Sequence, residues 1–359
     1  TGTAKANKCL GNLSGIMVTE RAGPTLSDNA CTRNGVGMSF ADGAHGSAAS
    51  NVCTDSSEDG IVVIGEAEPF LAMNTCARNQ KSGIGFSESA GGTALSNRCL
   101  RNAGPGIRVL DEANPALSRN ICEDNGTVGI FYTDSASGEA QQNRCSGNEH
   151  GGIMAMAESN PNLQENTCHN NQKGGIVIAD SSRPEVRQNH CQGGLFGIYL
   201  AGQATPLLMQ NRCEDNAEAG IAYFQATSGT AQRNVCQNNK QGIFVGDGAR
   251  PTLEENICRQ NGGNGISYGG HGAGIARRNE FSGSRFGANV HGQASPSLEG
   301  NLCCDNQIAG ILYFENASGR ALSNVCRGNE SGIRITAPAR PVLQANDCSG
   351  NRVRDVYYE

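Results

Sequence analysis

Short stretches of alternating apolar and polar residues recur along the chain at a fixed interval. The pattern Asn-x-Cys returns every 22 or 23 residues from Cys9 to Cys348, and Phe281 takes the cysteine place once. A consensus repeat reads Gly-Ile-x-Val, a polar turn, then Pro-x-Leu-x-x-Asn-x-Cys-x-x-Asn. The period-2 alternation predicts three short strands per repeat, and a period of this length is typical of a solenoid.

The repeat predicts an all-β fold, a right-handed parallel β-helix of about sixteen coils of 22–23 residues with three strands per coil. Successive coils would stack about 4.8 Å apart. We expect residues 1–359 to form a single β-helix domain. Because the chain begins at Thr1 without an initiator methionine, we also expect it to be an excerpt of a longer multidomain protein.

The side chains at two positions of the repeat change size together, so that a larger one at the first position accompanies a smaller one at the second. The residue two after the isoleucine alternates between aliphatic and aromatic, and the residue five before the cysteine alternates between Leu and Ala. Phe40 is accompanied by Ala48, for example, and Val63 by Leu71. Close packing conserves total volume, so both positions should face the interior of the coil.

The sixteen cysteines are spaced too regularly for a disulfide framework. We interpret them as an inward column of small, reduced thiols flanked by asparagine ladders, which favours a cytoplasmic location. The alternation places Cys304 outward. No Cys-x-x-Cys pair occurs and the histidines lack ligand spacing, so no metal site is expected.

Across essentially the whole chain, these repeats resemble the right-handed parallel β-helix repeats of the pectate-lyase-like superfamily. They look closest to its carbohydrate-binding and sugar-hydrolase branch. The resemblance implies the fold, whereas the superfamily's functions include lyases, epimerases, hydrolases, tailspikes and non-catalytic binding modules. The Asp-Pro-His-Glu motif of the similar mannuronan epimerases is absent from the sequence, so no catalytic residue is carried over.

The outward positions of the Gly-Ile strand are unusually apolar. A continuous apolar stripe suggests a docking face for a protein partner or a second copy, although β-propensity alone could fill a strand in this way. Sugar stacking is a third option, which favours aromatic residues. The stripe comprises Met17, Val62, Ile64, Leu110, Phe131, Met154, Met156, Val177, Tyr199, Phe224, Phe244, Leu312 and Phe314.

An acidic ridge is expected just past this strand in the first eight coils. Residues 1–180 carry a net charge of −7 and residues 181–359 a net charge of +1. The ridge could bind Ca²⁺ or a basic partner, could hold a glycosidase-like carboxylate pair, or could reflect the preference of acidic residues for turns. It comprises Glu20, Asp42, Glu66, Glu88, Asp111, Asp134, Glu158 and Asp180.

Coil 13 departs from the repeat, because Phe281 replaces the cysteine and polar residues follow it. If the protein acts on acidic polysaccharides, His291 would be the base and Arg285 a carboxylate binder, with His271 on the adjacent coil. Structural drift is the alternative, since a large side chain at the cysteine position requires compensation nearby.

Composition narrows the function further. The net charge of −6 argues against nucleic-acid binding, and no apolar run is long enough to span a membrane. We expect a non-enzymatic binding or scaffold module without a cofactor. The alternative is a polysaccharide-binding or polysaccharide-modifying β-helix with a site near coil 13.

Overall fold

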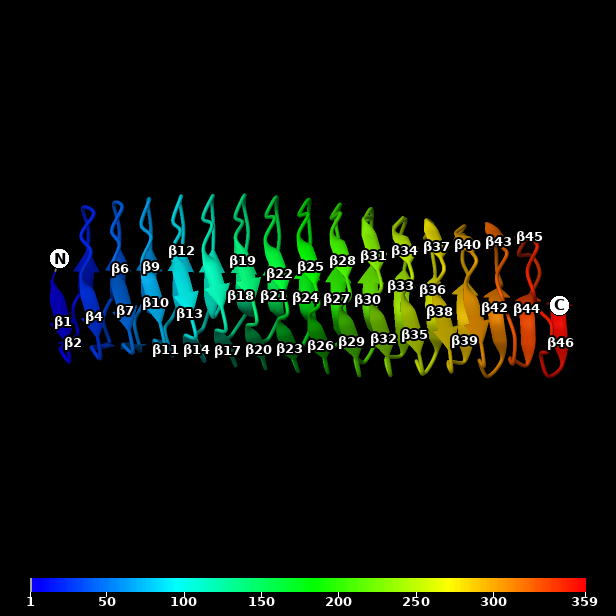
Figure 1. The fold of residues 1–359 in the computed structure, drawn as a ribbon, viewed down its shortest axis with the longest axis horizontal. Helices are drawn as coiled ribbons and strands as arrows, with labels where there is room; N and C mark the ends of the chain where they lie inside the picture. Colours follow the sequence, from blue (N-terminus) through cyan, green and yellow to red (C-terminus); the bar gives the residue numbers. More distant parts are fainter. Residues whose placement is uncertain (1) are drawn as a thin grey trace. The chain divides into compact units, whose positions relative to one another are not determined.

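The computed structural model describes residues 2–359, which form 46 β-strands and no helix. Accordingly, no helix within that range could cross a membrane. The chain divides into two compact units: unit 1 holds residues 1–177 and 182–185, and unit 2 holds residues 178–181 and 186–359. Both units are built from coils of three strands, and equivalent strands of successive coils lie side by side within each unit (Figure 1).

The first strand of each coil contributes to the first sheet. Unit 1 supplies β1 (Thr3–Lys5), β4 (Thr25–Ser27), β7 (Ser47–Ala49), β10 (Phe70–Ala72), β13 (Thr93–Leu95), β16 (Ala116–Ser118), β19 (Glu139–Gln141) and β22 (Asn162–Gln164). Unit 2 supplies β28 (Leu207–Met209), β31 (Thr230–Gln232), β34 (Thr252–Glu254), β37 (Ile275–Arg277), β40 (Ser297–Glu299), β43 (Arg320–Leu322) and β45 (Val342–Gln344), and β25 (Glu185–Arg187) spans the division.

The second strand carries the cysteine. Unit 1 supplies β2 (Lys8–Leu10), β5 (Ala30–Thr32), β8 (Val52–Thr54), β11 (Thr75–Ala77), β14 (Arg98–Leu100), β17 (Ile121–Glu123), β20 (Arg144–Ser146) and β23 (Thr167–His169). Unit 2 supplies β26 (His190–Gln192), β29 (Arg212–Glu214), β32 (Val235–Gln237), β35 (Ile257–Arg259), β38 (Glu280–Ser282) and β41 (Leu302–Cys304).

The third strand is the Gly-Ile strand. Unit 1 supplies β3 (Ser14–Val18), β6 (Val36–Phe40), β9 (Ile61–Val63), β12 (Ile84–Phe86), β15 (Ile107–Val109), β18 (Val128–Tyr132) and β21 (Gly151–Ala155), and β24 (Gly174–Ile178) spans the division. Unit 2 supplies β27 (Phe196–Leu200), β30 (Ala219–Tyr223), β33 (Gln241–Val245), β36 (Asn264–Tyr268), β39 (Phe286–Val290), β42 (Ala309–Tyr313), β44 (Ser331–Ile335) and β46 (Arg354–Tyr358).

The coil count and the parallel pairing confirm the predicted fold. Sixteen strands occupy the first position, fourteen the second and sixteen the third. The two last coils carry isolated bridges at the second position, where Val325 pairs with Leu302 and Asp347. Within each unit the paired strands of successive coils are parallel and in register, as for Phe40 opposite Val63. Each one-residue length difference is therefore absorbed in a turn.

The interior holds the residues that the repeat predicts. Phe40, Ala48, Val63 and Leu71 are fully buried, in agreement with the volume exchange between coils. The cysteines form in-register columns, and all sixteen are free thiols. Burial, and then hydrogen bonding to the thiol of Cys236, raise the pKa of Cys258, so this thiol is neutral at ordinary pH.

Asparagine ladders run beside the cysteine column. In each ladder, one side-chain oxygen accepts both the backbone N–H and the side-chain N–H of the asparagine one coil earlier, as Asn125 does for Asn102 at 3.1 and 3.0 Å. The Asn125 amide in turn donates to the carbonyl of Cys99 at 3.1 Å. The ladders thus satisfy buried backbone groups at the turns, where no strand partner exists.

Candidate functional site

Aromatic side chains gather on the outer face of the third sheet in unit 2. The outward column of this sheet runs Tyr199, Ala222, Phe244 and Ser267 in register. The next outward position, two residues along, carries Phe224 in the coil between Tyr199 and Phe244. Large and small side chains therefore alternate along these columns. A ring in one column contacts a ring of the neighbouring coil in the other column.

Ring contacts link these residues into one surface. Tyr199 and Phe224 have centroids 5.3 Å apart, and Phe224 and Phe244 have centroids 5.2 Å apart. Phe196, at the start of β27, lies 5.2 Å from Tyr199. The rings are half-buried, so one side of each contacts the sheet while part of it remains accessible. We call Phe196, Tyr199, Phe224, Phe244, His291 and Phe314 the aromatic track.

Glycines form the floor beneath part of the track. A Cβ on Gly246 would lie 2.7 Å from the Phe244 ring, and a Cβ on Gly269 would lie 2.8 Å from the His291 ring and 3.6 Å from Phe244. The His291 and Phe314 rings stack with centroids 5.3 Å apart and an angle of 16°. The rings can therefore lie close to the sheet and present their faces outward.

The charges near the track lie at its C-terminal end. Glu315 Oε2 lies 3.9 Å from His291 Nδ1 and accepts the backbone N–H of Gly292 at 2.7 Å. The Arg285 guanidinium lies 5.5 Å from the Phe286 ring, and within residues 2–359 it forms no ion pair with a carboxylate.

A hollow of about 440 Å³ adjoins this end of the track. In its wall, Asn289 Oδ1 and Arg334 Nε are buried without a hydrogen-bond partner in the described part of the chain. The Arg285 guanidinium suits a ligand rich in hydroxyl or carboxylate groups, whereas Arg334 is already paired with Glu359. The lining comprises Arg285, Phe286, Asn289, Ile308, Leu312, Phe314, Arg334, Thr336 and Glu359.

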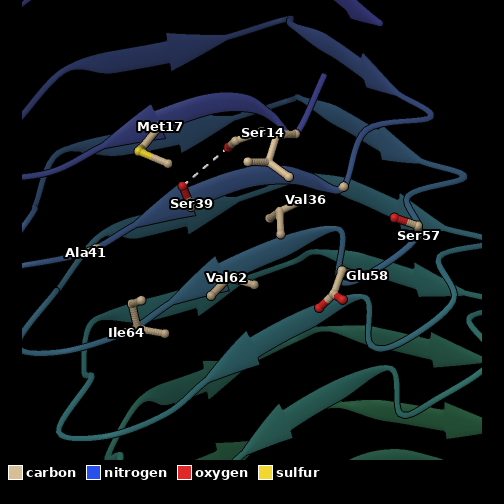
Figure 2. A pocket seen from close by; sticks show the side chains of 11 residues that line it. Ser14, Met17, Val36, Ser39, Ala41, Ser57, Glu58, Val62 and Ile64 are labelled. Carbon is tan, nitrogen blue, oxygen red and sulfur yellow. Dashed lines mark hydrogen bonds between the residues drawn. The ribbon is translucent and has the colours of Figure 1, made fainter. Parts of the chain in front are cut away.

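The third sheet of unit 1 presents aliphatic residues instead. Its first hollow, of about 420 Å³, lies between Met17 on β3 and Val62 on β9 (Figure 2). A second, of about 350 Å³, is lined by Phe131 and Met154. Beside it, Arg108 reaches across Gly85 to the buried carboxylate of Asp59 at 3.2 Å.

The acidic ridge is exposed along its whole predicted length. The turn gives several of its residues a left-handed backbone, with φ of 60° at Glu88 and 56° at Asp111. The Asp111 carboxylate accepts the backbone N–H of Glu88 at 2.8 Å, and Asp134 accepts that of Asp111 at 3.3 Å. These contacts provide a structural reason for acidic residues here. Within residues 2–359, no three His, Cys, Asp or Glu side chains are grouped to hold a metal ion.

The residues suggested for catalysis lie on two adjacent coils, with no direct contact between their side chains in the described chain. His291 belongs to the aromatic track, whereas His271 is exposed in the preceding turn and shares no hydrogen bond or ring contact with His291 in the described chain. Arg285 lies at the hollow near Phe314. In coil 13, Phe281 is fully buried and Ser284 continues the ladder, its Oγ accepting the N–H of Asn261 at 3.2 Å. The irregular coil thus keeps the repeat architecture.

Most of the predicted apolar stripe is accessible, with two exceptions. Met17 is 64% exposed, whereas Val177 is 2% and Leu312 9% exposed. The expectation that these two face solvent is therefore corrected. Leu312 lies in register between Asn289 and Arg334, so side chains of the two neighbouring coils flank and cover it. The remaining stripe residues, Val62, Ile64, Leu110, Phe131, Met154, Met156, Tyr199, Phe224, Phe244 and Phe314, are half-buried.

Sequence reasoning missed two features of unit 2. Phe196 joins the aromatic track from the position two before the isoleucine, where strict period-2 alternation places an inward side chain, so the sequence pattern could not have found it. On the second sheet, the nearly buried Glu214 accepts hydrogen bonds from Arg212 at 2.6 Å, His190 Nε2 at 2.7 Å and Gln237 at 2.8 Å. The Arg212 hydrogen bond chiefly lowers the pKa of Glu214.

Solved structures with a similar fold include the periplasmic alginate epimerase AlgG, with a TM-score of 0.53, 12% identity, and coverage of 92% of this chain and 78% of that chain. A mannuronic acid specific polysaccharide family 6 lyase from human gut microbiota has a TM-score of 0.42 and 11% identity, over 84% and 77%. The Vag8–C1 inhibitor complex gives 0.45 and 10%, over 99% of both chains. At these identities the likeness shows the fold alone.

None of the curated proteins compared matches the sequence. The family described as the right handed beta helix region matches residues 14–167, 142–276 and 227–358, which overlap to cover nearly the whole chain. These matches agree with the parallel three-strand coils, the cysteine column and the asparagine ladders described above. The chain therefore belongs to the right-handed β-helix family.

Proposed function

We propose that this protein binds a polysaccharide along the aromatic track of unit 2. The observation that carries the proposal is the continuous row of half-buried rings from Phe196 to Phe244, in which Phe244 lies against Gly246. A flat aromatic face stacks well against the C–H face of a sugar ring, and several such contacts in a row suit a chain of sugars.

The position of the track supports an extended ligand rather than a compact one. The rings of Tyr199, Phe224 and Phe244 belong to three successive coils, each about 4.8 Å from the next. A polymer lying across the coils can therefore contact several rings at once. The shared fold with the alginate epimerase AlgG agrees with a polysaccharide as ligand.

The hollow beside Phe314 would receive polar groups of the bound polysaccharide. Arg285 lines this hollow, is exposed and has no carboxylate partner within residues 2–359, so its guanidinium can donate hydrogen bonds to sugar hydroxyls or carboxylates. We assign no chemical step to His271, Arg285 or His291. Binding is thus the proposed function, in preference to the protein scaffold that the sequence first suggested.

Native affinity electrophoresis of the full chain tests this proposal. Gels would contain alginate, polygalacturonate or a soluble β-glucan, and the wild-type protein should be retarded by at least one of them. Phe224→Ala should lose most of that retardation because Phe224 contacts three other rings of the track. Phe131→Ala in unit 1 is the matched control. If no polysaccharide retards the wild-type chain, the proposal is wrong.

A further inference from the structure

A second surface, in unit 1, has a different chemistry from the aromatic track. It is the hollow between β3 and β9, which the intervening coil lines with Val36 and Ser39 of β6 and with Ala41 just after that strand (Figure 2). Ser39 lies in register between Met17 and Val62, so the larger residues rise on both sides of it. The hollow of about 420 Å³ therefore arises where one coil has a small outward side chain and its two neighbouring coils have larger ones.

The hollow is lined mainly by apolar side chains, with three serines, Gly35 and Glu58 between them. Met17 is 64% and Leu13 90% exposed, and Val36, Val62 and Ile64 are half-buried. Unlike the track of unit 2, the lining contains no aromatic ring, so it offers no flat surface for stacking on a sugar. Flexible and branched aliphatic side chains instead suit the apolar side chain of a polypeptide.

Carboxylates border the hollow where the third strands end. Asp42 directly follows Ala41, Glu66 lies two residues after Ile64, and Glu20 occupies the corresponding turn of the first coil. All three are exposed, and none forms an ion pair within the described residues. Arg21, beside Gly43, is the cation of this turn, so the border remains negatively charged. At the opposite border, Glu58 is paired with Lys81.

We propose that this hollow docks a peptide segment of a partner protein that carries an aliphatic side chain flanked by Lys or Arg. The aliphatic side chain would fill the space above Ser39, and the cations would face Glu20, Asp42 and Glu66. This charge complementarity selects the partner, because an acidic polysaccharide would be repelled from this border. A symmetric contact with a second copy would place the same carboxylates against each other, which disfavours it.

The proposal does not depend on polysaccharide binding in unit 2. Its test uses the full chain and a fluorescein-labelled peptide of sequence Gly-Lys-Lys-Leu-Gly-Ile-Lys-Lys-Gly, followed by fluorescence anisotropy. Two control peptides replace all Lys by Glu, or Leu and Ile by Ser. Wild type should bind the first peptide and neither control at the same concentration.

Two variants separate the apolar and charged contributions. Ser39→Leu fills the hollow from an outward position and should weaken binding about tenfold or more. Asp42→Asn combined with Glu66→Gln should weaken binding several-fold and reduce its dependence on salt. Phe244→Ala in unit 2 should leave peptide binding unchanged, and circular dichroism checks that each variant keeps its sheet structure.

Three outcomes would overturn the proposal. The Glu peptide could bind as tightly as the Lys peptide, or Ser39→Leu could bind like wild type while folded. Alternatively, light scattering could show that wild type grows in size with concentration and that Ser39→Leu does not, which would assign the hollow to a second copy. None of these results would bear on Phe224→Ala in affinity gels, so the two proposals fail separately.

Discussion

The ring of Phe244 lies over Gly246, where a Cβ would come within 2.7 Å of two ring carbons. Gly246→Ala should therefore tilt the ring away from the sheet while leaving the fold intact, since the clash is with a side chain that can move. We expect polysaccharide affinity to fall about fivefold, measured in the affinity gels described above. Gly262→Ala is the matched control, because nothing approaches its Cβ position more closely than 4.0 Å. Equal retardation of both variants would mean that ring orientation is unimportant.

The asparagine ladder should contribute strongly to stability. Asn125→Ala would leave the backbone and side-chain N–H groups of Asn102, and the carbonyl of Cys99, without their partner in a buried turn. We expect a loss of about 3 kcal/mol in the free energy of unfolding, measured by urea denaturation. A loss below about 1 kcal/mol would argue that water replaces the amide readily.

The same ladder predicts a stabilising substitution at coil 13. Ser284 accepts one hydrogen bond from Asn261, whereas an asparagine at the equivalent place accepts two and donates a third. Ser284→Asn should therefore raise the free energy of unfolding by about 1 kcal/mol. A destabilised Ser284→Asn would instead indicate that Phe281, in the same coil, has reshaped the turn.

Stability should depend on pH through Glu214. Its pKa is lowered from 4.5, first by the Arg212 hydrogen bond and also by His190, while burial opposes the shift. A group with a lowered folded pKa stabilises the fold fully above its unfolded value and less as pH falls through the folded value. Glu214→Gln should thus be destabilised by about 1 kcal/mol at pH 7. The difference from wild type should shrink below pH 4.5 in urea titrations, and a constant difference would contradict this assignment.

The buried tyrosines allow a test of whether an unpaired buried hydroxyl lowers the stability of the fold. Tyr268 is fully buried, its hydroxyl has no hydrogen-bond partner in the described protein, and burial raises its pKa. Phe40 and Phe86 occupy the same inward position in unit 1 without a hydroxyl. Tyr268→Phe should therefore keep or raise the thermal midpoint, because removing an unpaired buried hydroxyl costs nothing. A clear drop in the midpoint would reveal a partner for this hydroxyl.

The repeat alone was sufficient to predict the fold. The Asn-x-Cys period implied parallel stacking, and the pairing of Phe40 with Ala48 implied two inward positions, both of which are buried. These predictions succeed because a solenoid imposes the same environment on a given position in every repeat. Each coil therefore gives one more example of the residue type that this position requires.

The candidate site was only partly predictable. Tyr199, Phe224 and Phe244 were recognised as outward residues, but their contacts across coils depend on ring direction and on the small size of Gly246 and Ala222. The consensus says nothing about either. The burial of Leu312 likewise depends on the lengths of the side chains in the neighbouring coils. The register between coils could be predicted from the sequence, whereas the direction in which each outward ring points could not.

The most direct test of polysaccharide binding by the aromatic track is isothermal titration calorimetry with the polysaccharide that retards the wild-type chain. Wild type, Phe244→Ala and the unit 1 control Phe131→Ala would be compared at one pH and salt concentration. Loss of one stacking ring should weaken binding by about tenfold in Phe244→Ala, with Phe131→Ala unchanged. Equal affinities for all three proteins would contradict the assignment of the track as the binding surface.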